Sequence, residues 1–207
     1  MLKQTPPSSR KRSLARAPHA AASRSNARER VLDTAYALFS RHGVRGVGVD
    51  EVIARAPVAK VTFYRHFRSK SDLVLAVLER REQEWTTGYV EAESERRGSN
   101  AEERLLAIFD VFGEWFARDD FEGCTFIRVL LQVDADNVVG QASLHYLENI
   151  RAMIRSRAVE AGLRDPDDFA RSWHILMKGA ILAAADGEPE AARRAQDMAR
   201  TLIDNFR

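Results

Sequence analysis

Residues 58–73 gather side chains of this 207-residue chain that suit contact with nucleic acid. Lys60 and Tyr64 can reach DNA phosphates, and Thr62 offers a hydroxyl and a methyl to a base edge. His66 follows within the same segment. Two short amphipathic helices joined by a tight turn would carry these side chains into a major groove. The segment therefore predicts a DNA-binding protein, with repression of transcription as the expected outcome.

The elements that must position these side chains follow from helical periodicity. Apolar residues recur at helical spacing over about 26–43, 49–56 and 59–66, with a turn at Pro57 between the second and third helices. Phe63 and Phe67 are expected in the core.

Helix ends are predicted from capping patterns. Asn26 with Glu29, and Ser69 with Asp72, have the spacing of a capping box. Gly43 suits a left-handed position after the first helix.

The rest of the chain also has helical patterns, so we expect an all-α fold of about nine helices without strands. Ser99 and Glu102 are expected to open a helix, and the apolar run 124–133 is expected to form a central, buried one. The predicted organisation is a disordered basic arm over 1–25, a helix-turn-helix domain over 26–72, and a larger helical domain over 73–207.

Charge is distributed unevenly between the two ends of the chain. Residues 1–70 hold 15 Lys and Arg against 4 Asp and Glu, a net charge of +11. Residues 71–207 hold 17 against 26, a net charge of −9, which leaves +2 for the whole chain. A basic module joined to an acidic body is typical of a protein that binds DNA phosphates. The arm over 1–25 could follow the phosphates or remain a solvated tail.

Residues 27–80 resemble the TetR family of bacterial transcriptional regulators. The resemblance is carried by residues 35–43, by Ile53-Ala-Arg-Ala, and by the Tyr-x-x-Phe-x-x-Lys-x-x-Leu pattern from Tyr64 to Leu73. It implies a homodimer whose N-terminal helices bind a double-stranded DNA operator. It also implies a C-terminal helical domain that dimerises and binds a small-molecule effector. The leading expectation is thus a repressor released from a palindromic operator by its effector.

The resemblance directs attention to two sets of residues. The expected DNA contacts are Arg45, Gly48, Lys60, Val61, Thr62, Tyr64, Arg65, His66 and Lys70. The expected effector contacts are Phe112, Trp115, Phe126, Met153, Trp173 and Met177, although aromatic residues on helical stripes are more often ordinary core.

This chain departs from the family pattern at three positions. Pro57 replaces the usual glycine of the turn, and its fixed φ excludes a left-handed residue there. Gly48 and Ala59 replace residues with hydroxyl groups that would cap helices.

The sequence leaves one alternative function open and gives no support to another. A non-specific nucleic-acid-binding protein would follow from the basic arm alone. An enzyme is not expected, since no phosphate loop, nucleophile elbow, catalytic residue, metal cluster or cofactor site stands out. Cys124 is expected to be a small buried hydrophobe. A single cysteine and the lack of long apolar runs predict a cytoplasmic protein that does not enter a membrane.

Dimerisation is expected through the last two helices. Their stripes carry small residues that would allow close approach between subunits, although packing within one subunit is the alternative. These residues are Ala180, Ala184, Ala191 and Ala195.

Overall fold

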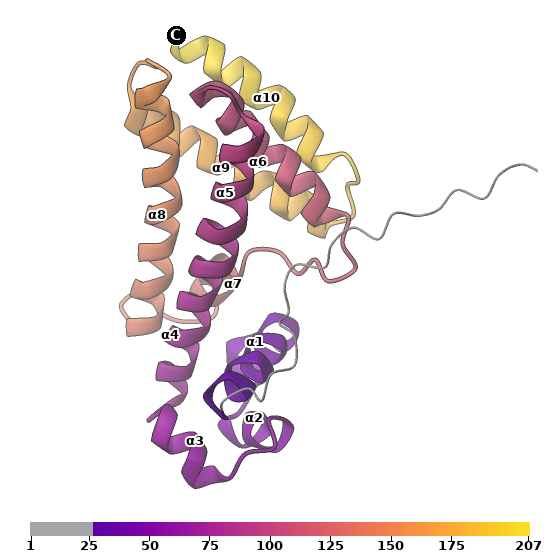
Figure 1. The fold of residues 1–207 in the computed structure, drawn as a ribbon, viewed down its shortest axis with the longest axis vertical. Helices are drawn as coiled ribbons and strands as arrows, with labels where there is room; N and C mark the ends of the chain where they lie inside the picture. Colours follow the sequence, from indigo (N-terminus) through magenta and orange to yellow (C-terminus); the bar gives the residue numbers. More distant parts are fainter. Residues whose placement is uncertain (1–26) are drawn as a thin grey trace, which may run out of the picture.

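The computed structural model describes residues 27–207 and is all-helical over that range (Figure 1). Segments α4, η1 and α5 follow one another without a break, so the eleven labelled segments form nine continuous helices. The expected fold class is confirmed. The basic arm and the predicted cap Asn26 lie outside the described residues. The elements are α1 (Ala27–Gly46), α2 (Val49–Arg55), α3 (Lys60–His66), α4 (Lys70–Arg81), η1 (Glu82–Glu91), α5 (Ala92–Arg97), α6 (Ala101–Phe116), α7 (Thr125–Leu130), α8 (Val138–Glu160), α9 (Pro166–Ala185) and α10 (Ala191–Phe206).

Helices α1 to α3 occupy one end of the molecule and share their core with helices from later in the chain (Figure 1). Phe63 of α3 is fully buried and Phe67 is 2% exposed, as expected. The same hydrophobic cluster includes Phe126 and Val129 of α7, together with Leu147 of α8. Because apolar burial drives this packing, the position of α1 depends on α7 as well as on its own neighbours.

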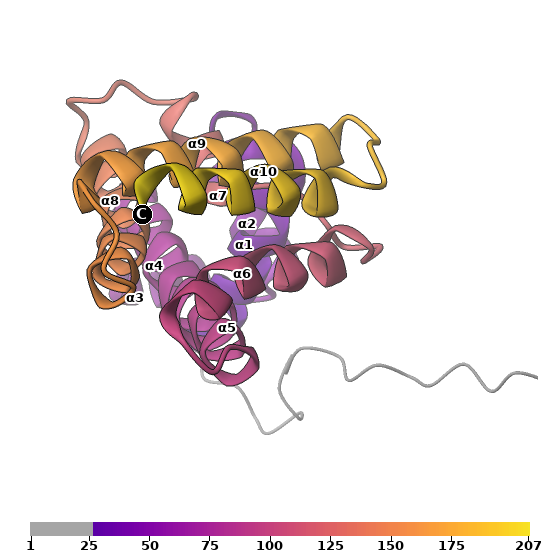
Figure 2. The same ribbon diagram turned by 90° about the horizontal axis from the view of Figure 1, so that it is seen from above.

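The opposite end is built from α6, α8, α9 and α10. Figure 2 shows α9 and α10 lying side by side along one outer edge of the molecule, and both helices also pack against α6. Ala180, Ala191 and Ala195 are at most 6% exposed, and they pack inside this subunit. Three of the four alanines therefore serve packing within one subunit, which was the alternative to a role between subunits, whereas Ala184 is half-buried.

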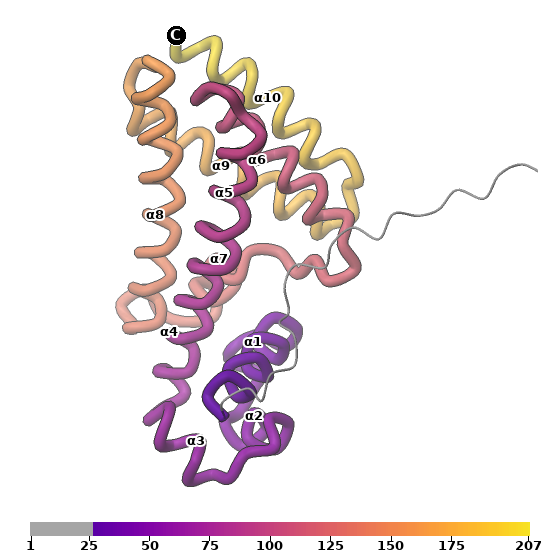
Figure 3. Tube along the Cα trace, in the orientation of Figure 1, coloured from indigo at the N-terminus to yellow at the C-terminus, as the bar shows by residue number. Residues whose placement is uncertain are grey.

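One long helix, α4–η1–α5, connects the two ends, and the tube in Figure 3 follows it as an unbroken rod. Its middle part, η1, is a π-helix, which is rare and often occurs at functional sites. The backbone at Gly88 passes close to the carbonyl oxygen of Gln83. A Cβ atom at position 88 would lie 2.6 Å from that oxygen, so glycine suits this position. The widened turn carries Trp85, Thr86 and Val90, which line a cavity described below.

Gly43 interrupts α1 with a φ of 73°, the positive value expected from the sequence. The side chain of Gln132, which follows α7, lies directly against it. A Cβ atom at position 43 would be 2.3 Å from the Gln132 Nε2 atom, and the positive φ itself favours glycine here. The backbone N–H of Arg45 also donates a hydrogen bond to Gln132 Oε1 at 3.3 Å. The end of α1 is thus joined to the segment after α7.

Two expectations from the sequence were wrong in detail. The apolar run 124–133 forms only the short helix α7, of which Phe126 and Val129 are buried, and Leu131 after it is 81% exposed. The cap of α6 is Asn100, which accepts a hydrogen bond from the Glu103 N–H at 2.9 Å, one residue later than predicted. Neighbouring polar residues can each serve as a cap, so the sequence pattern alone did not distinguish the two registers.

Candidate functional site

The connection between α2 and α3 is a tight turn containing Pro57. Positive φ angles among residues 27–207 occur only at Asp165 and at glycines 43, 123, 162 and 187, so no residue of this turn is left-handed. This agrees with the constraint that proline imposes on its own φ. Gly48 and Ala59 stand at the N-caps of α2 and α3 without a side-chain cap, as their residue types require.

The fourth helix begins with the predicted capping box. Ser69 Oγ accepts a hydrogen bond from the Asp72 N–H at 3.1 Å, and Asp72 Oδ2 accepts one from the Arg68 N–H at 3.0 Å. The box fixes the start of α4 directly behind α3, and it places Lys70 in the first turn.

The exposed side of α3 combines basic and apolar groups. Val61 is 82% exposed and Tyr64 is 44% exposed, whereas Phe63 between them is buried. Exposed apolar side chains on a short basic helix suit contact with base edges and thymine methyl groups. Of the other expected contacts, Arg45, Gly48, Lys60 and Arg65 are exposed, and Thr62, His66 and Lys70 are half-buried. We call the nine expected DNA contacts, which lie on α3 and beside it, the α3 surface.

Lys60 of the α3 surface already has an acidic partner. Its Nζ atom lies 2.9 Å from Oδ1 of Asp50 on α2, and both side chains are mainly exposed. The hydrogen bond to Asp50 raises the pKa of Lys60 above its ordinary value. A DNA phosphate would therefore compete with Asp50 for this lysine.

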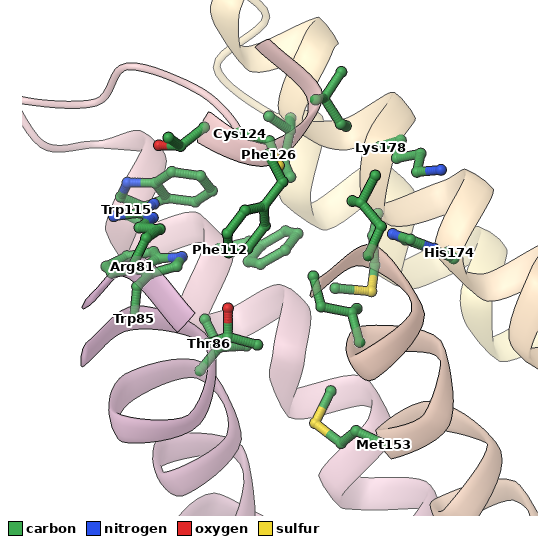
Figure 4. Close-up of a pocket in the computed structure, with 17 residues that line it drawn as sticks. Arg81, Trp85, Thr86, Phe112, Trp115, Cys124, Phe126, Met153, His174 and Lys178 are labelled. Carbon is green, nitrogen blue, oxygen red and sulfur yellow. The ribbon is translucent and has the colours of Figure 1, made fainter. Parts of the chain in front are cut away.

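A second candidate site is a cavity of about 550 Å³, including the open space at its mouth, that lies between α4–η1, α6, α7, α8 and α9 (Figure 4). It is mainly apolar, as small-molecule sites usually are. The lining residues are Arg81, Trp85, Thr86, Val90, Phe112, Trp115, Cys124, Thr125, Phe126, Ile127, Leu147, Ile150, Met153, His174, Met177, Lys178 and Ile181.

The structure brings together five of the six residues expected to contact an effector. Phe112, Trp115, Phe126, Met153 and Met177 all line the cavity. Trp173 does not. It is fully buried in the adjoining core, where its ring lies 5.4 Å from Phe109 and 5.3 Å from Phe169.

Three basic residues of the cavity were not predicted as site residues. Arg81 is positioned by α4, and His174 and Lys178 by α9. A sequence signal did exist for one of them, because Lys178 is the single lysine among residues 71–207, where 16 arginines occur. Figure 4 shows His174 and Lys178 across the cavity from Arg81, Trp85 and Trp115.

Burial shifts the pKa values of three cavity groups. Burial first, and then the charges of Lys178 and Arg151, lower the pKa of His174 to about 3, so the imidazole is neutral near pH 7. Its Nδ1 atom is buried without a hydrogen-bond partner among the described residues. Burial also raises the pKa of the Cys124 thiol, which keeps it protonated and unreactive. Burial lowers the pKa of Lys178.

The N-terminal helices match a family of known proteins. A family model described as "Bacterial regulatory proteins, tetR family" matches residues 31–77. The transcriptional repressor NemR of Escherichia coli is 28% identical over 167 residues, which cover 76% of this chain and 83% of NemR. The transcriptional activator FasR of Mycolicibacterium smegmatis is 33% identical over 96 residues, which cover 46% of this chain but only 43% of FasR.

Solved structures extend the similarity over almost the whole chain. A TetR-family transcriptional regulator from Streptomyces coelicolor has a TM-score of 0.80 at 25% identity, covering 87% of this chain and 95% of that one. A putative regulator of the same family from Streptomyces avermitilis has a TM-score of 0.79 at 29% identity. The match covers 88% of this chain and 98% of that one. The chain belongs to the TetR family.

As a TetR-family protein, the chain is a DNA-binding transcriptional regulator and not an enzyme. Over residues 27–207, no cluster of three or more His, Cys, Asp or Glu residues could hold a metal ion. In the same range no helix is both long and apolar enough to cross a membrane.

The depressed pKa of His174 predicts acid sensitivity of this regulator. The unfolded chain binds a proton at this histidine below about pH 6.5, whereas the folded chain does not until about pH 3, so stability falls across that window. We expect the wild type to lose about 2 kcal/mol more than His174→Gln between pH 7 and pH 5. Urea unfolding at both pH values measures this difference. His42→Gln, at an exposed position, should behave as the wild type. Equal losses in wild type and His174→Gln would contradict the assignment.

Proposed function

We propose that this TetR-family regulator is a cytoplasmic repressor that leaves a palindromic operator when a small molecule occupies the cavity. Residues 26–72 would form the DNA-binding domain and residues 73–207 the effector-binding and dimerisation domain. Repression is favoured over activation because the match to the repressor NemR spans 83% of that protein, whereas the match to the activator FasR spans 43%.

The α3 surface is the observation that carries the DNA-binding part of the proposal. Lys60, Tyr64 and His66 have groups that can reach phosphates, while Val61 and Thr62 offer apolar and hydroxyl contacts to base edges. A protein that bound only phosphates would have no use for the exposed Val61 on this face. The proposal therefore favours sequence-specific binding over the non-specific alternative.

The double variant Lys60→Ala with Tyr64→Phe tests the α3 surface. We expect about tenfold weaker binding to the preferred duplex, because a cation and a hydroxyl are lost while Asp50 is left to repel phosphate. The slope of log affinity against log salt concentration should decrease by about one. Fluorescence anisotropy at several salt concentrations measures both quantities.

Arg200→Ala is the matched control for this variant. Arg200 is exposed on α10 and forms no ion pair with any described residue. Its removal should leave DNA affinity unchanged. If the double variant bound DNA as tightly as this control, the α3 surface would not be the recognition surface.

The release part of the proposal is supported by two connections from the cavity to α1. Arg81 lines the cavity, and its guanidinium donates a hydrogen bond of 2.8 Å to the hydroxyl of Tyr36 on α1. Helix α7 presents Phe126 to the cavity, and the Gln132 side chain that follows it lies against Gly43. An effector that moved Arg81 or α7 would shift α1 and the helices packed on it.

This coupling requires that the effector bind one arrangement of α1 more tightly than the other, since a ligand shifts an equilibrium only by its differential affinity. The arrangement with the effector bound would hold α3 at a spacing that no longer fits the operator. The thermodynamic coupling between effector and DNA is then reciprocal and is typically about 1–3 kcal/mol.

Tyr36→Phe tests the Arg81 connection. It removes the hydroxyl that accepts the Arg81 hydrogen bond and keeps the ring in place. We expect DNA affinity and effector affinity to change by less than about twofold, while the effector-induced loss of DNA affinity decreases severalfold. Titrating DNA in the presence and absence of effector measures the coupling. Tyr89→Phe, in η1, should keep the full coupling. Undiminished coupling in Tyr36→Phe would remove this connection from the account.

Dimerisation is proposed through the outer faces of α9 and α10. Ile175 and Leu182 of α9 are 69% and 72% exposed, and Met198 of α10 is 60% exposed. Positions seven residues apart lie on the same side of a helix, so Ile175 and Leu182 share one face. A second copy of the chain would cover this apolar face and bring two α3 surfaces to one operator.

The variant Ile175→Asp with Leu182→Asp should convert a dimer into a monomer, because it places charge in an apolar interface. Light scattering at micromolar concentration measures the mass. Leu131→Asp, at an 81% exposed position after α7, should leave the dimer intact. A wild-type protein of monomeric mass would contradict the proposed assembly.

A further inference from the structure

The polar side chains of the cavity are all neutral or basic. Its lining contains Arg81 and Lys178 as cations, together with His174, two threonines and Cys124, but no Asp or Glu. A cavity that is mainly apolar and holds two positive charges without a negative one has an unbalanced electrostatic field. A ligand with a negative charge would balance these two cations.

The two cations differ in what they already contact. The Arg81 guanidinium donates to Tyr36 and lies over the rings of Trp85 and Trp115, at 4.4 and 5.5 Å from their centroids. Lys178, in contrast, is half-buried and has no hydrogen bond or ion pair with any described residue. Lys178 is therefore the cation that is free to meet a ligand.

His174 stands beside Lys178 as a second unused group. The two residues occupy positions i and i+4 of α9, so their side chains are neighbours on one face of the helix. His174 is 3% exposed, and its Nδ1 atom lacks a partner among the described residues although buried polar atoms normally have one. A neutral imidazole with its proton on Nδ1 would donate a hydrogen bond to an acceptor at this place.

We infer that the cavity binds an apolar organic anion, a small carboxylic acid with an aromatic or alkyl body, whose carboxylate lies at Lys178 and His174. The body would lie among Phe112, Met153 and Met177, and extend toward Trp85 and Trp115 across the cavity (Figure 4). This inference rests on the proposed function, since it names the chemical class of the effector.

The physical reason is the cost of burying a charge without a partner. A half-buried ammonium gains little from water, and a carboxylate beside it forms a charge-assisted hydrogen bond about twice as strong as a neutral one. A cationic ligand would instead be repelled by both Lys178 and Arg81. Arg151 lies near enough to lower the pKa of Lys178, but its Nε atom donates to the Glu148 carboxylate at 2.8 Å, so the uncompensated cation at this edge is Lys178.

Three probes with the same phenylalkyl body and different head groups test the inference: phenylbutyrate, phenylbutanol and phenylbutylamine. Two of the three tryptophans of the chain line the cavity, so quenching of their fluorescence reports binding without DNA. We expect the acid to bind about tenfold or more tightly than the alcohol, and the amine to bind more weakly still.

Variants of Lys178 connect this preference to the residue. In Lys178→Met the acid should bind no more tightly than the alcohol, while the affinity for the alcohol stays within about twofold, because the apolar lining is kept. Lys178→Arg should retain the preference for the acid. Arg171→Met, which removes an exposed cation from the same helix, is the matched control and should bind as the wild type. Circular dichroism and thermal unfolding confirm that each variant is folded.

The inference is overturned if the alcohol or the amine binds as tightly as the acid, if none of the three probes binds, or if the preference for the acid survives in Lys178→Met. Release from DNA is measured separately with the same probes. Selective binding of the acid that left DNA affinity unchanged would support the ligand class and contradict the proposed release, so the two failures are distinguishable.

Discussion

The attachment of α1 to α4 and α7 is the constraint on which the rest of this structure depends. Arg80 forms ion pairs with Glu29 and Asp33 of α1, and the adjacent Arg81 donates to Tyr36 one turn further along. Buried apolar contacts with α7 complete the attachment. Because α2 and α3 pack on α1, these few contacts determine where the DNA-contacting face lies relative to the cavity.

Much of this arrangement could be predicted from the sequence, and the parts that could not have physical reasons. Periodicity alone placed Phe63 and Phe67 in the core and the flanking side chains outside, because a helix buries one face. The cavity is different, since aromatic stripes look alike whether they line a hollow or fill a core. Trp173 and Met177 lie on the same helix, yet only Met177 meets the cavity.

The basic groups of the cavity were missed for a related reason. Lys178 has no hydrogen bond or ion pair, and His174 Nδ1 no hydrogen bond, with any of residues 27–207, and such an absence is visible only when the neighbouring helices are in place. Helix α7 was misplaced because an apolar run does not show which element covers it. In the structure its two faces serve different neighbours, the cavity on one side and α1 on the other, so it remains half-buried.

The central claim, sequence-specific binding through the α3 surface, is tested most directly by selection from random-sequence duplexes at physiological salt. The account predicts enrichment of a two-fold symmetric site that binds at least about a thousandfold more tightly than bulk DNA. If no sequence were enriched, and binding to all duplexes collapsed together as salt increased, the protein would be a non-specific phosphate binder and the account would be wrong.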